Sequence, residues 1–588
     1  MSMDIVVPQV SDGVDSGTVI AVAVSEGDQV EADQTLIELE TDKAVVAIPS
    51  PAAGKIVALK VETGQQVAVG AVIAVLAEDS GHAADDIDSS AETREQQGQE
   101  KETSEEATEG AAEPTAEADS DKTEATAAAP AGRDLVVIGA GPGGYAAAFR
   151  AAALGLTVTL VDPAENPGGV CLYRGCIPSK ALLHAAKMIT DADEAAAIGV
   201  SFAAPEIDIE RLRAWKDDVI GRLTGGLGAK AEKLKVTRLR GTARFRDSHR
   251  LEVTDPDGNT SDLEFSQAII ATGSRPIMLP GVPADSQRIV DSTGALALRE
   301  VPDSLLVVGG GYIGLELGSA YAAFGSKVTV VEMTDGLLPG CDRDLVSVLK
   351  RRLDGVFAEI LLKTRVVELK EQKNGVAVTL EDKKGKQSGR RFDQVLIAVG
   401  RRPNTESLEC DKAGVTVDEK GFVKVDGQQR TSRPHIFAIG DIAGEPMLAH
   451  KAYAEAEVAA RVAAGEKAVY EPRAIPAVVF TDPEVAWCGL TETAAREQKI
   501  KVKTAKLPWR SNGRCLTLGR DNGMTKLIVD AESDRILGVA VAGPGAGELI
   551  AEGVLAMEMA AVSEDLRATI HPHPTLAETL YEAAQMLT

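Results

Sequence analysis

The sequence predicts a multidomain protein: a small all-β sandwich, two Rossmann-like α/β domains and a C-terminal α+β domain. Three observations support this prediction. The chain has 588 residues, which is too long for a single hydrophobic core. Residues 1–77 alternate in the manner of β-strands, and a strand–glycine turn–helix pattern occurs twice, about 170 residues apart.

The first 77 residues contain six strand-like stretches separated by turn residues. Two segments are similar, SEGDQVEADQTLIELE and ETGQQVAVGAVIAVLA, since each runs from an acidic residue through glycine to valine and then into a strand. This internal repeat places residues 41–44, TDKA, near the turn that joins the two halves.

Residues 78–131 are predicted to form a disordered linker. Between residues 78 and 130, Ile87 is the only large aliphatic residue, and 17 Asp and Glu stand against three Lys and Arg. Such a segment cannot bury enough apolar surface to offset the entropy lost on folding. It supplies about half of the net charge of −27, so the folded parts are only mildly acidic.

The composition also excludes several classes of protein. A net charge of −27 argues against nucleic acid as a partner. No stretch approaches the ~20 apolar residues of a membrane span, and the start lacks the features of a signal peptide, so a cytoplasmic protein is expected. Six Cys in a chain of this length do not form a disulfide scaffold, and a close pair is more plausibly redox-active or metal-binding.

The first glycine-rich turn follows the strand LVVI and opens an Ala-rich helix. Its glycines, Gly139, Gly141 and Gly144, permit a tight turn and a close approach of a pyrophosphate to backbone N–H groups. Asp162 ends the next strand, 23 residues after Gly139, where a carboxylate can accept hydrogen bonds from ribose hydroxyls. The pattern predicts a dinucleotide site.

The second turn repeats this arrangement with Gly309, Gly311 and Gly314, and Glu332 stands 23 residues after Gly309. An acid at that place would repel a 2′-phosphate, which favours NAD over NADP. Two nicotinamides in one chain would have little to exchange, so a flavin and a nicotinamide are the expected pair.

Between the two turns lies GGVCLYRGCIPSKALLH, residues 168–184. Cys171 and Cys176 stand at the entrance to a helix, close enough to bridge if Cys171 lies in an irregular turn. A helix N-terminus and the nearby Lys180 favour a thiolate. A pair of merely buried cysteines is the alternative, while a zinc site lacks a second Cys/His pair at ligand spacing.

The chain ends with HPHPTLAETLYEAAQMLT. His573 stands between two prolines, and Glu578 follows five residues later. Thr575 and Glu578 also form T-x-x-E, a capping box that would merely start the last helix. His571 has no feature beyond that of a surface residue.

Taken together, these motifs resemble the dihydrolipoamide dehydrogenase branch of the disulfide oxidoreductase family of flavoproteins, along nearly all of residues 133–588. Seven motifs occur in the family's order. They are GAGPGG, GGVCLYRGCIPSK, ATGSRP at 271–276, GGGYIGLE, AVGRRPN at 398–404, AIGD at 438–441 and HPHPTLAE.

The resemblance implies roles for individual residues. Cys171 and Cys176 would be the redox disulfide, His573 the acid–base and Glu578 its orienting partner. Lys180 and Glu316 would form an ion pair beside the flavin. Other implied cofactor-binding residues are Gly273 and Asp441 for FAD, with Lys180 beside it, and Gly400 for NAD.

It further implies a homodimer in which His573 serves the partner subunit's site, and a division into domains. The expected boundaries are 1–77 for a lipoyl domain, 78–131 for the linker, 132–273 for FAD binding, 274–402 for NAD binding, 403–470 for a central domain that completes the FAD site, and 471–588 for dimerisation.

Residues 1–77 resemble a lipoyl domain, with Lys43 as the attachment point for a lipoyl group. Lysines in turns are usually only solvated, but the central place in the repeat favours modification. A biotin domain would be expected to show Met-Lys-Met at this turn, whereas here Asp42 and Ala44 flank Lys43. The lipoyl arm implies a 2-oxo acid dehydrogenase complex as partner.

Other interpretations within and outside the class stay open. Tyr173 and Arg174 replace the family's usual Asn-Val between the cysteines. A glutathione reductase would carry basic residues where Glu332 stands, and a mercuric reductase a C-terminal Cys pair. The chain could also be chiefly a lipoyl carrier or tethering subunit, although an acyltransferase motif of the type HxxxDG is absent from the sequence.

Overall fold

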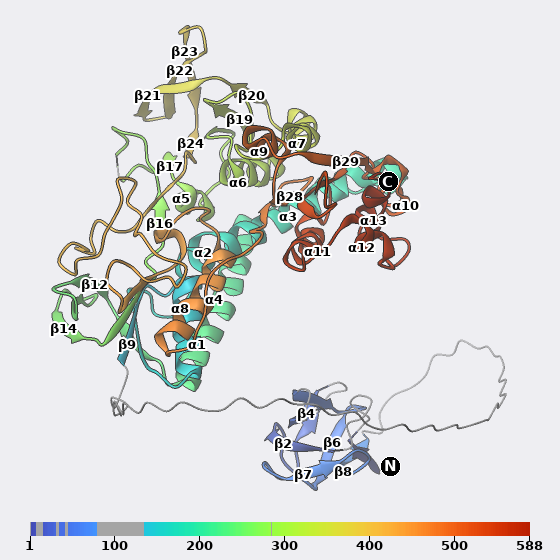
Figure 1. The fold of residues 1–588 in the computed structure, drawn as a ribbon. Helices are drawn as coiled ribbons and strands as arrows, with labels where there is room; N and C mark the ends of the chain where they lie inside the picture. The colour runs from blue at the N-terminus through green and yellow to red at the C-terminus, as the bar shows by residue number, and fades with distance from the viewer. Residues whose placement is uncertain are drawn as a thin grey trace, which may run out of the picture. The chain divides into compact units, whose positions relative to one another are not determined.

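A computed structural model describes residues 2–7, 16–30, 34–40, 45–78, 134–283 and 285–587. The chain divides into two units, Met1–Thr123 and Glu124–Thr588, which are described separately (Figure 1). The predicted linker 78–131 lies outside the described residues, apart from Glu78 at the end of a strand.

The N-terminal unit is a sandwich of two antiparallel sheets, as predicted. Within the described ranges their strand orders are β1-β8-β6-β3 and β5-β4-β2-β7. Aliphatic side chains that point inward, such as Val19, Leu36 and Ile73, are completely buried between the sheets. The strands are β1 (Ser2–Val6), β2 (Ser16–Val22), β3 (Gln29–Val30), β4 (Thr35–Glu40), β5 (Val45–Pro49), β6 (Gly54–Leu59), β7 (Gln66–Ala68) and β8 (Val72–Glu78).

The internal repeat is visible in the backbone. The short strands β3 and β7, which the alternation of residues did not predict, occupy corresponding places before β4 and β8. Gly27 and Gly64 precede them, both with positive φ, so both halves turn in the same way. Strands β4 and β5 pair with Glu40 opposite Val45, and Lys43, which stands between them in the sequence, lies outside the described residues.

The second unit begins with a parallel sheet of order β11-β10-β9-β15-β26. Strand β26 reaches this sheet from far along the chain, so residues after the second α/β domain complete the first one. Helix α8 packs against α1 on the sheet (Figure 1). The elements are β9 (Asp134–Ile138), α1 (Pro142–Ala153), β10 (Thr157–Asp162), α2 (Gly169–Arg174), α3 (Cys176–Glu194), η1 (Ala195–Ile198), α4 (Ile209–Lys233), β11 (Thr237–Arg240), β15 (Gln267–Ile270), β26 (Ile436–Ala438), η2 (Gly440–Ile442) and α8 (Ala449–Ala463), with a three-stranded sheet of β12 (Thr242–Phe245), β13 (Arg250–Thr254) and β14 (Thr260–Glu264).

The second α/β domain repeats the plan with a parallel sheet of order β17-β24-β18-β19-β20. The small sheet β16-β25 joins the two segments that lead into and out of this domain. The elements are β16 (Ser274–Pro276), β17 (Ile289–Val290), α5 (Ser292–Leu296), β18 (Ser304–Val308), α6 (Tyr312–Ala323), β19 (Lys327–Glu332), α7 (Arg343–Val356), β20 (Glu359–Leu362), β21 (Arg365–Gln372), β22 (Gly375–Glu381), β23 (Gln387–Phe392), β24 (Gln394–Ile397) and β25 (Arg401–Pro403).

The C-terminal part is an antiparallel sheet of order β27-β28-β31-β30-β29 with helices packed on it, which confirms the α+β prediction (red in Figure 1). Trp509 and Leu580 are completely buried in its core. The elements are β27 (Ala477–Val479), β28 (Val485–Gly489), α9 (Glu492–Gln498), β29 (Val502–Pro508), η3 (Trp509–Ser511), α10 (Gly513–Thr517), β30 (Met524–Asp530), β31 (Ile536–Ala542), α11 (Ala546–Glu558), α12 (Ser563–Ala568) and α13 (Glu578–Gln585).

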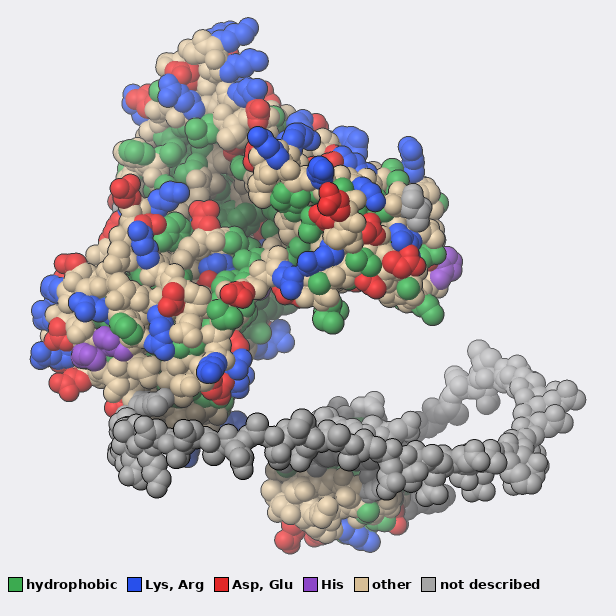
Figure 2. Space-filling view, in the orientation of Figure 1, with side chains coloured by type: hydrophobic (Ala, Val, Ile, Leu, Met, Phe, Trp, Pro, Cys, Tyr) green, Lys and Arg blue, Asp and Glu red, His purple; other side chains and the backbone are tan. Residues whose placement is uncertain are grey.

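Basic and acidic side chains are interspersed over the face of the second unit seen in Figure 2. This distribution agrees with the expectation that the net charge is not concentrated on the folded domains. In the described part of the chain, no helix combines the length and apolarity needed to cross a bilayer.

Candidate active site: a cysteine pair between two glycine turns

A cavity of about 880 Å³ lies in the second unit and is lined by nine of the predicted site residues. Its lining includes Gly139, Asp162, Cys171 and Cys176 from the first α/β domain, and Glu316 from the second. Lys180, Gly141, Gly273 and Asp441 also line it. The sequence places these residues up to 302 positions apart, from Gly139 to Asp441, and the fold brings them to one cavity.

The first glycine turn is held by the predicted acid. Asp162 ends β10, and its Oδ2 accepts a hydrogen bond from the backbone N–H of Ala140 at 2.7 Å. Gly139 has φ +97°, and a Cβ there would lie 2.5 Å from the carbonyl oxygen of Ala271. Any side chain at Gly139 would therefore push apart the turn and the neighbouring strand.

The second turn has the same construction. Glu332 ends β19, and its Oε2 accepts from the backbone N–H of Gly310 at 2.7 Å. Gly309 has φ +113°, and a Cβ there would lie 2.3 Å from the carbonyl oxygen of Ala398. The two turns and their acids thus confirm the strand–turn–helix–strand geometry that the sequence predicted.

The middle glycine of each turn supports the prediction of bound dinucleotides. A Cβ at Gly141 would meet only the Cα of Gly169, at 3.9 Å, and one at Gly311 would meet no described atom within 4 Å. Protein packing therefore does not require glycine here, whereas a pyrophosphate approaching the helix N-terminus does. Gly273 and Gly400 differ, because their positive φ values, +67° and +129°, favour glycine in themselves, and Gly273 also lines the cavity. The residues present at both turns fit the pyrophosphate of a dinucleotide such as FAD or NAD.

The two cysteines are free thiols that lie close enough together to shift each other's pKa. Cys171 lies in the short helix α2, which corrects the expectation of an irregular turn. Gly175 ends this helix, and α3 begins at Cys176. A Cβ at Gly175 would lie 2.8 Å from the carbonyl oxygen of Val170, so only glycine lets the two helices meet this closely. This break is what brings the sulfur atoms together.

The two thiols differ in acidity. The neighbouring Cys171 thiol lowers the pKa of Cys176 to about 7, against the effect of burial and with help from the charge of Lys180. The neighbouring Cys176 thiol and burial raise the pKa of Cys171. Cys176 is therefore the thiolate of the reduced pair.

Lys180 forms the ion pair that the resemblance implied. Its Nζ lies 2.8 Å from Oε2 of Glu316 on α6 and 4.2 Å from the centre of the Phe480 ring. The other oxygen of Glu316 accepts from the backbone N–H of Phe480 at 3.0 Å. Glu316 is buried and satisfied on both oxygens, so it fixes the ammonium group beside Cys176.

A pH-dependent alkylation rate follows from this arrangement. In the reduced protein, Cys176 is a thiolate above about pH 7 and becomes protonated below it, because its pKa is lowered. The rate of iodoacetamide labelling should therefore rise with a midpoint near pH 7. Lys180→Met should move that midpoint to higher pH, whereas Lys187→Met, on the same helix but paired with Asp191, should not. An unmoved midpoint in Lys180→Met would contradict this electrostatic role.

A polar network at the cavity was missed by the sequence analysis. The hydroxyl of Ser274 donates to Asp441, the predicted FAD ligand, and accepts from Nε of Arg401 at 2.8 Å. Arg401 Nη2 also donates to the carbonyl oxygen of Ser274 at 2.7 Å. These residues lie in the motifs ATGSRP, AVGRRPN and AIGD, in which only Gly273, Gly400 and Asp441 had been selected. The network ties the three motifs together beside the cavity.

His573 and Glu578 meet as predicted, with Nδ1 2.8 Å from Oε1. The other oxygen of Glu578 accepts from the backbone N–H of Thr575 at 2.7 Å. The capping box is only half formed, because the Thr575 hydroxyl donates to Pro572 and the N-cap of α13 is Ala577. Glu578 thus both fixes the turn before the helix and orients the imidazole.

The chain does not bring His573 to its own cysteines. Its side chain is 78% exposed in the C-terminal domain, and it is not among the residues that line the cavity. The expectation that His571 is a surface residue is wrong, because its side chain is 5% exposed and its Nε2 lies 2.8 Å from Oε1 of Glu552. The two histidines therefore have different surroundings, although one residue separates them.

Comparison with known families agrees with this geometry. Residues 133–456 match the family described as pyridine nucleotide-disulphide oxidoreductase, residues 475–584 match its dimerisation domain, and residues 3–76 match the biotin-requiring enzyme family. The chain therefore belongs to the pyridine nucleotide-disulphide oxidoreductase family. It is an NAD-dependent flavoprotein disulfide oxidoreductase with a dimerisation domain and an N-terminal biotin/lipoyl domain, and FAD, NAD and a lipoyl group are its cofactors.

Several bacterial relatives are named dihydrolipoyl dehydrogenase. The dihydrolipoyl dehydrogenase of Haemophilus influenzae is 48% identical over 452 residues, covering 77% of this chain and 94% of the relative. That of Thermus scotoductus is 48% identical over 456 residues, covering 77% of this chain and 97% of the relative. Among solved structures, LpdA of Mycobacterium tuberculosis has a TM-score of 0.72 at 28% identity, over 77% of this chain and 99% of its own. The HOCl-induced flavoprotein disulfide reductase RclA of Escherichia coli has a TM-score of 0.69 at 28% identity, over 77% of this chain and 100% of its own.

Proposed function

We propose that the protein is a dihydrolipoyl dehydrogenase. It oxidises protein-bound dihydrolipoamide to lipoamide and reduces NAD⁺ to NADH, as a component of a 2-oxo acid dehydrogenase complex in the cytoplasm. The observation that carries the proposal is the pair of free thiols Cys171 and Cys176, which line the same cavity as the first glycine turn. The names of the relatives support the choice of substrate.

The proposed residues act in two exchange steps. His573 accepts a thiol proton from dihydrolipoamide, and the resulting thiolate attacks Cys171 of the oxidised pair. The bond between Cys171 and Cys176 breaks, and Cys176 leaves as a thiolate beside Lys180. The second substrate thiol then attacks the mixed disulfide and its proton passes to Cys171, so lipoamide is released, Cys171 returns as a thiol and His573 keeps the first proton.

FAD supplies the redox chemistry that carries the electron pair from the thiols to NAD⁺. We assign Gly139, Gly141, Gly144, Asp162, Gly273 and Asp441 to FAD binding, with Lys180 beside it. For NAD we assign Gly309, Gly311, Gly314, Glu332 and Gly400. The protein itself positions the two dinucleotides and stabilises the thiolate.

We further propose that the active unit is a homodimer in which His573 of one subunit serves the cysteines of the other. The exposed position of His573, away from the cavity of its own chain, supports this arrangement. The dimerisation domain at residues 475–584 agrees with it. The division into domains at 78, 132, 274, 403 and 471 is part of the same proposal.

The function is tested by assaying the purified holoprotein. It should be yellow and should form NADH from dihydrolipoamide with NAD⁺, and it should show little reduction of glutathione disulfide with NADPH. A colourless protein after FAD reconstitution, or a preference for glutathione disulfide, would reject the proposal.

A separate prediction concerns Lys43, which we propose as the site of lipoylation. The intact mass of protein from cells able to lipoylate should exceed the sequence mass by one lipoyl group. Lys43→Arg should remove this increment, whereas Lys55→Arg, in strand β6, should keep it. A lipoyl increment that survives in Lys43→Arg would place the attachment elsewhere.

A further inference from the structure

We propose that Lys526, a buried residue of the C-terminal domain, is a positioning residue for the NAD site. It holds Asp342, and through Asp342 the loop 333–342, against the second glycine turn. The inference rests on the proposed function only in assigning this turn to NAD.

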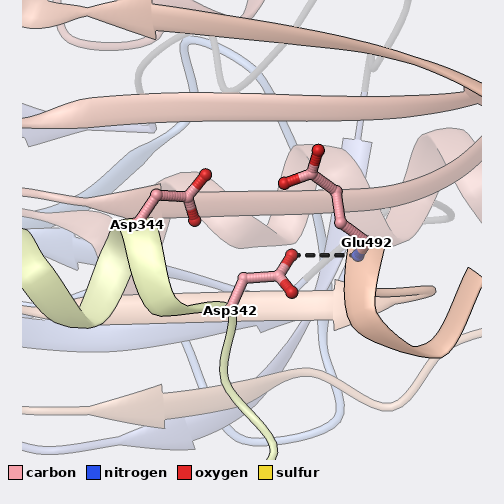
Figure 3. Close-up of side chains that lie close together, drawn as sticks. All are labelled: Asp342, Asp344 and Glu492. Carbon is pink, nitrogen blue, oxygen red and sulfur yellow. Dashed lines mark hydrogen bonds between the residues drawn. The ribbon is translucent and has the colours of Figure 1, made fainter. Parts of the chain in front are cut away.

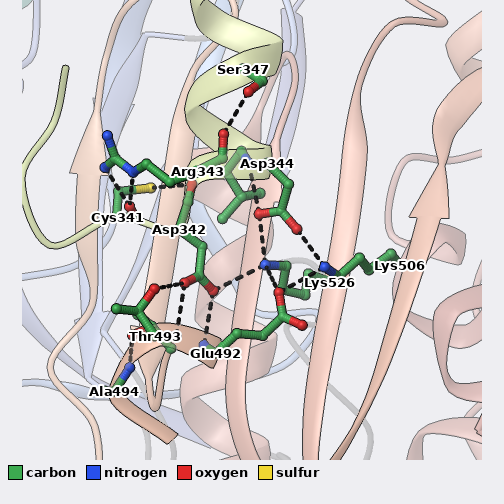
Figure 4. A network of polar contacts seen from close by, with 12 residues as sticks. Cys341, Asp342, Arg343, Asp344, Ser347, Glu492, Thr493, Ala494, Lys506 and Lys526 are labelled. Carbon is green, nitrogen blue, oxygen red and sulfur yellow. Dashed lines mark hydrogen bonds and ion pairs between the residues drawn. The ribbon is translucent and has the colours of Figure 1, made fainter. Parts of the chain in front are cut away.

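Lys526 is completely buried on β30, and its ammonium group is surrounded by three carboxylates. Its Nζ lies 3.0 Å from Oδ2 of Asp342, 2.7 Å from Oδ1 of Asp344 and 2.8 Å from Oε2 of Glu492 (Figure 4). Asp342 and Asp344 come from the NAD-binding domain at the start of α7, while Glu492 starts α9 of the C-terminal domain. A single ammonium group therefore joins the two domains.

The three carboxylates converge as a metal site would (Figure 3). Lys526 already supplies the cation between them, and Lys506 adds a second at 2.9 Å from Asp344 and 2.7 Å from Glu492. Hydrogen bonds to the carboxylates raise the pKa of Lys526 although burial acts in the opposite direction. The cluster is therefore an ion network centred on the buried Lys526 and Asp342, in which removing Lys526 leaves uncompensated charge on Asp342.

Asp342 also links the two domains through hydrogen bonds to the backbone. It occupies the N-cap position of α7, yet its carboxylate accepts from the backbone N–H groups of Glu492 and Thr493, at 3.0 and 3.2 Å. The Thr493 hydroxyl donates to it as well, at 3.1 Å. Asp342 therefore binds the first turn of α9 in the other domain instead of its own helix.

From Asp342 the contacts lead to the glycine turn. The next residue, Arg343, donates to the carbonyl oxygens of Leu337 and Leu338, each at 2.8 Å. The N–H of Leu338 donates to the carbonyl oxygen of Gly310 at 2.9 Å. The N–H of Gly310 donates in turn to Glu332.

The loop 333–342 is therefore fixed at both ends. One end follows Glu332, the proposed ribose acceptor, and the other is bound by Lys526 through Asp342. If Lys526 is removed, repulsion among the carboxylates should displace Asp342 and with it the loop. The backbone N–H groups of the second glycine turn, to which the loop is hydrogen-bonded, should then move as well. Binding of NAD should weaken, while the cysteine cavity should be unaffected.

The test is Lys526→Met in the full-length holoenzyme, with ADP-ribose as a probe that binds without redox chemistry. We expect the Kd of ADP-ribose by calorimetry and the KM for NAD⁺ to rise about fivefold to tenfold, a coupling that such networks carry, while kcat and the KM for dihydrolipoamide change by less than about twofold. Lys506→Met is the matched control, because Lys506 contacts the same carboxylates except Asp342 and its side chain is 42% exposed. It should bind ADP-ribose like the wild type.

Asp342→Asn provides a second route if Lys526→Met does not fold, since it keeps the shape of the side chain and should weaken ADP-ribose binding in the same direction. Unchanged ADP-ribose binding in the folded variants would overturn the inference. An equal loss of ADP-ribose binding in Lys506→Met would also overturn it. So would a parallel loss of kcat and of dihydrolipoamide binding in Lys526→Met, because either result would indicate a general loss of structure. If the wild type itself does not bind ADP-ribose, the NAD assignment fails together with the inference.

Discussion

Replacing Cys176 or Cys171 by serine is expected to lower the turnover of dihydrolipoamide by about 10³-fold or more while the protein keeps its flavin. A serine hydroxyl cannot form the disulfide that the substrate thiolate attacks, so neither exchange step can occur. The first glycine turn and its acid are separate from the sulfur atoms, so FAD binding should persist. NADH formation and the flavin absorbance, both measured per mole of folded protein, check the two expectations.

Cys410→Ser is the matched control. This thiol is buried, and burial raises its pKa to about 11, so it is not a reactive thiolate. The substitution should lower stability but leave turnover per folded enzyme within about twofold of the wild type. If Cys171→Ser or Cys176→Ser turned over as well as Cys410→Ser, the cysteine pair would have no part in the reaction.

The parts of the site that are local in sequence were predictable. Gly139 with Asp162, and Gly309 with Glu332, lie within one strand–helix–strand unit, and their spacing alone places the acid beside the turn. The same holds for His573 and Glu578, which are separated by a single turn. In each case, both residues belong to one local motif, so no contact with a distant segment is needed to bring them together.

Contacts between distant segments were not predictable in this way. Ser274 meets Asp441 across 167 residues, and Lys526 meets Asp342 across 184. Strand and helix periodicity shows which side of an element is buried, but it does not show which buried polar group faces which. The motif order signalled that residues 271–276, 398–404 and 438–441 belong together, whereas no motif marked Lys526.

Two local details also differed from expectation. Cys171 lies in a helix because Gly175 supplies the break that an irregular turn would otherwise have provided. Thr575 does not cap α13, because its hydroxyl donates to the carbonyl oxygen of Pro572 in the preceding turn. Both depend on backbone angles at one residue, which the residue types permit but do not require.

The second large effect is expected for His573→Ala, which should lower kcat with dihydrolipoamide by about 10²-fold to 10⁴-fold, the usual contribution of a general base. Glu578 holds Nδ1 of His573 at 2.8 Å, which leaves Nε2 to exchange protons with a substrate. Backbone hydrogen bonding from Thr575, and then the contact with His573, lower the pKa of Glu578, so this carboxylate stays charged across the neutral range. Flavin content should not change.

The control for this variant is His571→Ala. His571 is held by Glu552 and by the carbonyl oxygen of Thr569, so its loss should lower the melting temperature without removing the acid–base. Turnover per folded enzyme should stay within about threefold of the wild type. An unchanged rate in His573→Ala would remove this residue from the mechanism.

Mixed dimers then decide which subunit supplies the histidine. If His573 serves the partner's cysteines, a dimer of one Cys171→Ser subunit and one His573→Ala subunit contains one intact site, although each variant alone has none. Random mixing makes about half of the dimers mixed, and each mixed dimer has one intact site out of two. Activity should therefore return to about a quarter of the wild-type value. If His573 served its own chain, no mixed dimer would contain an intact site, and the mixture would stay inactive.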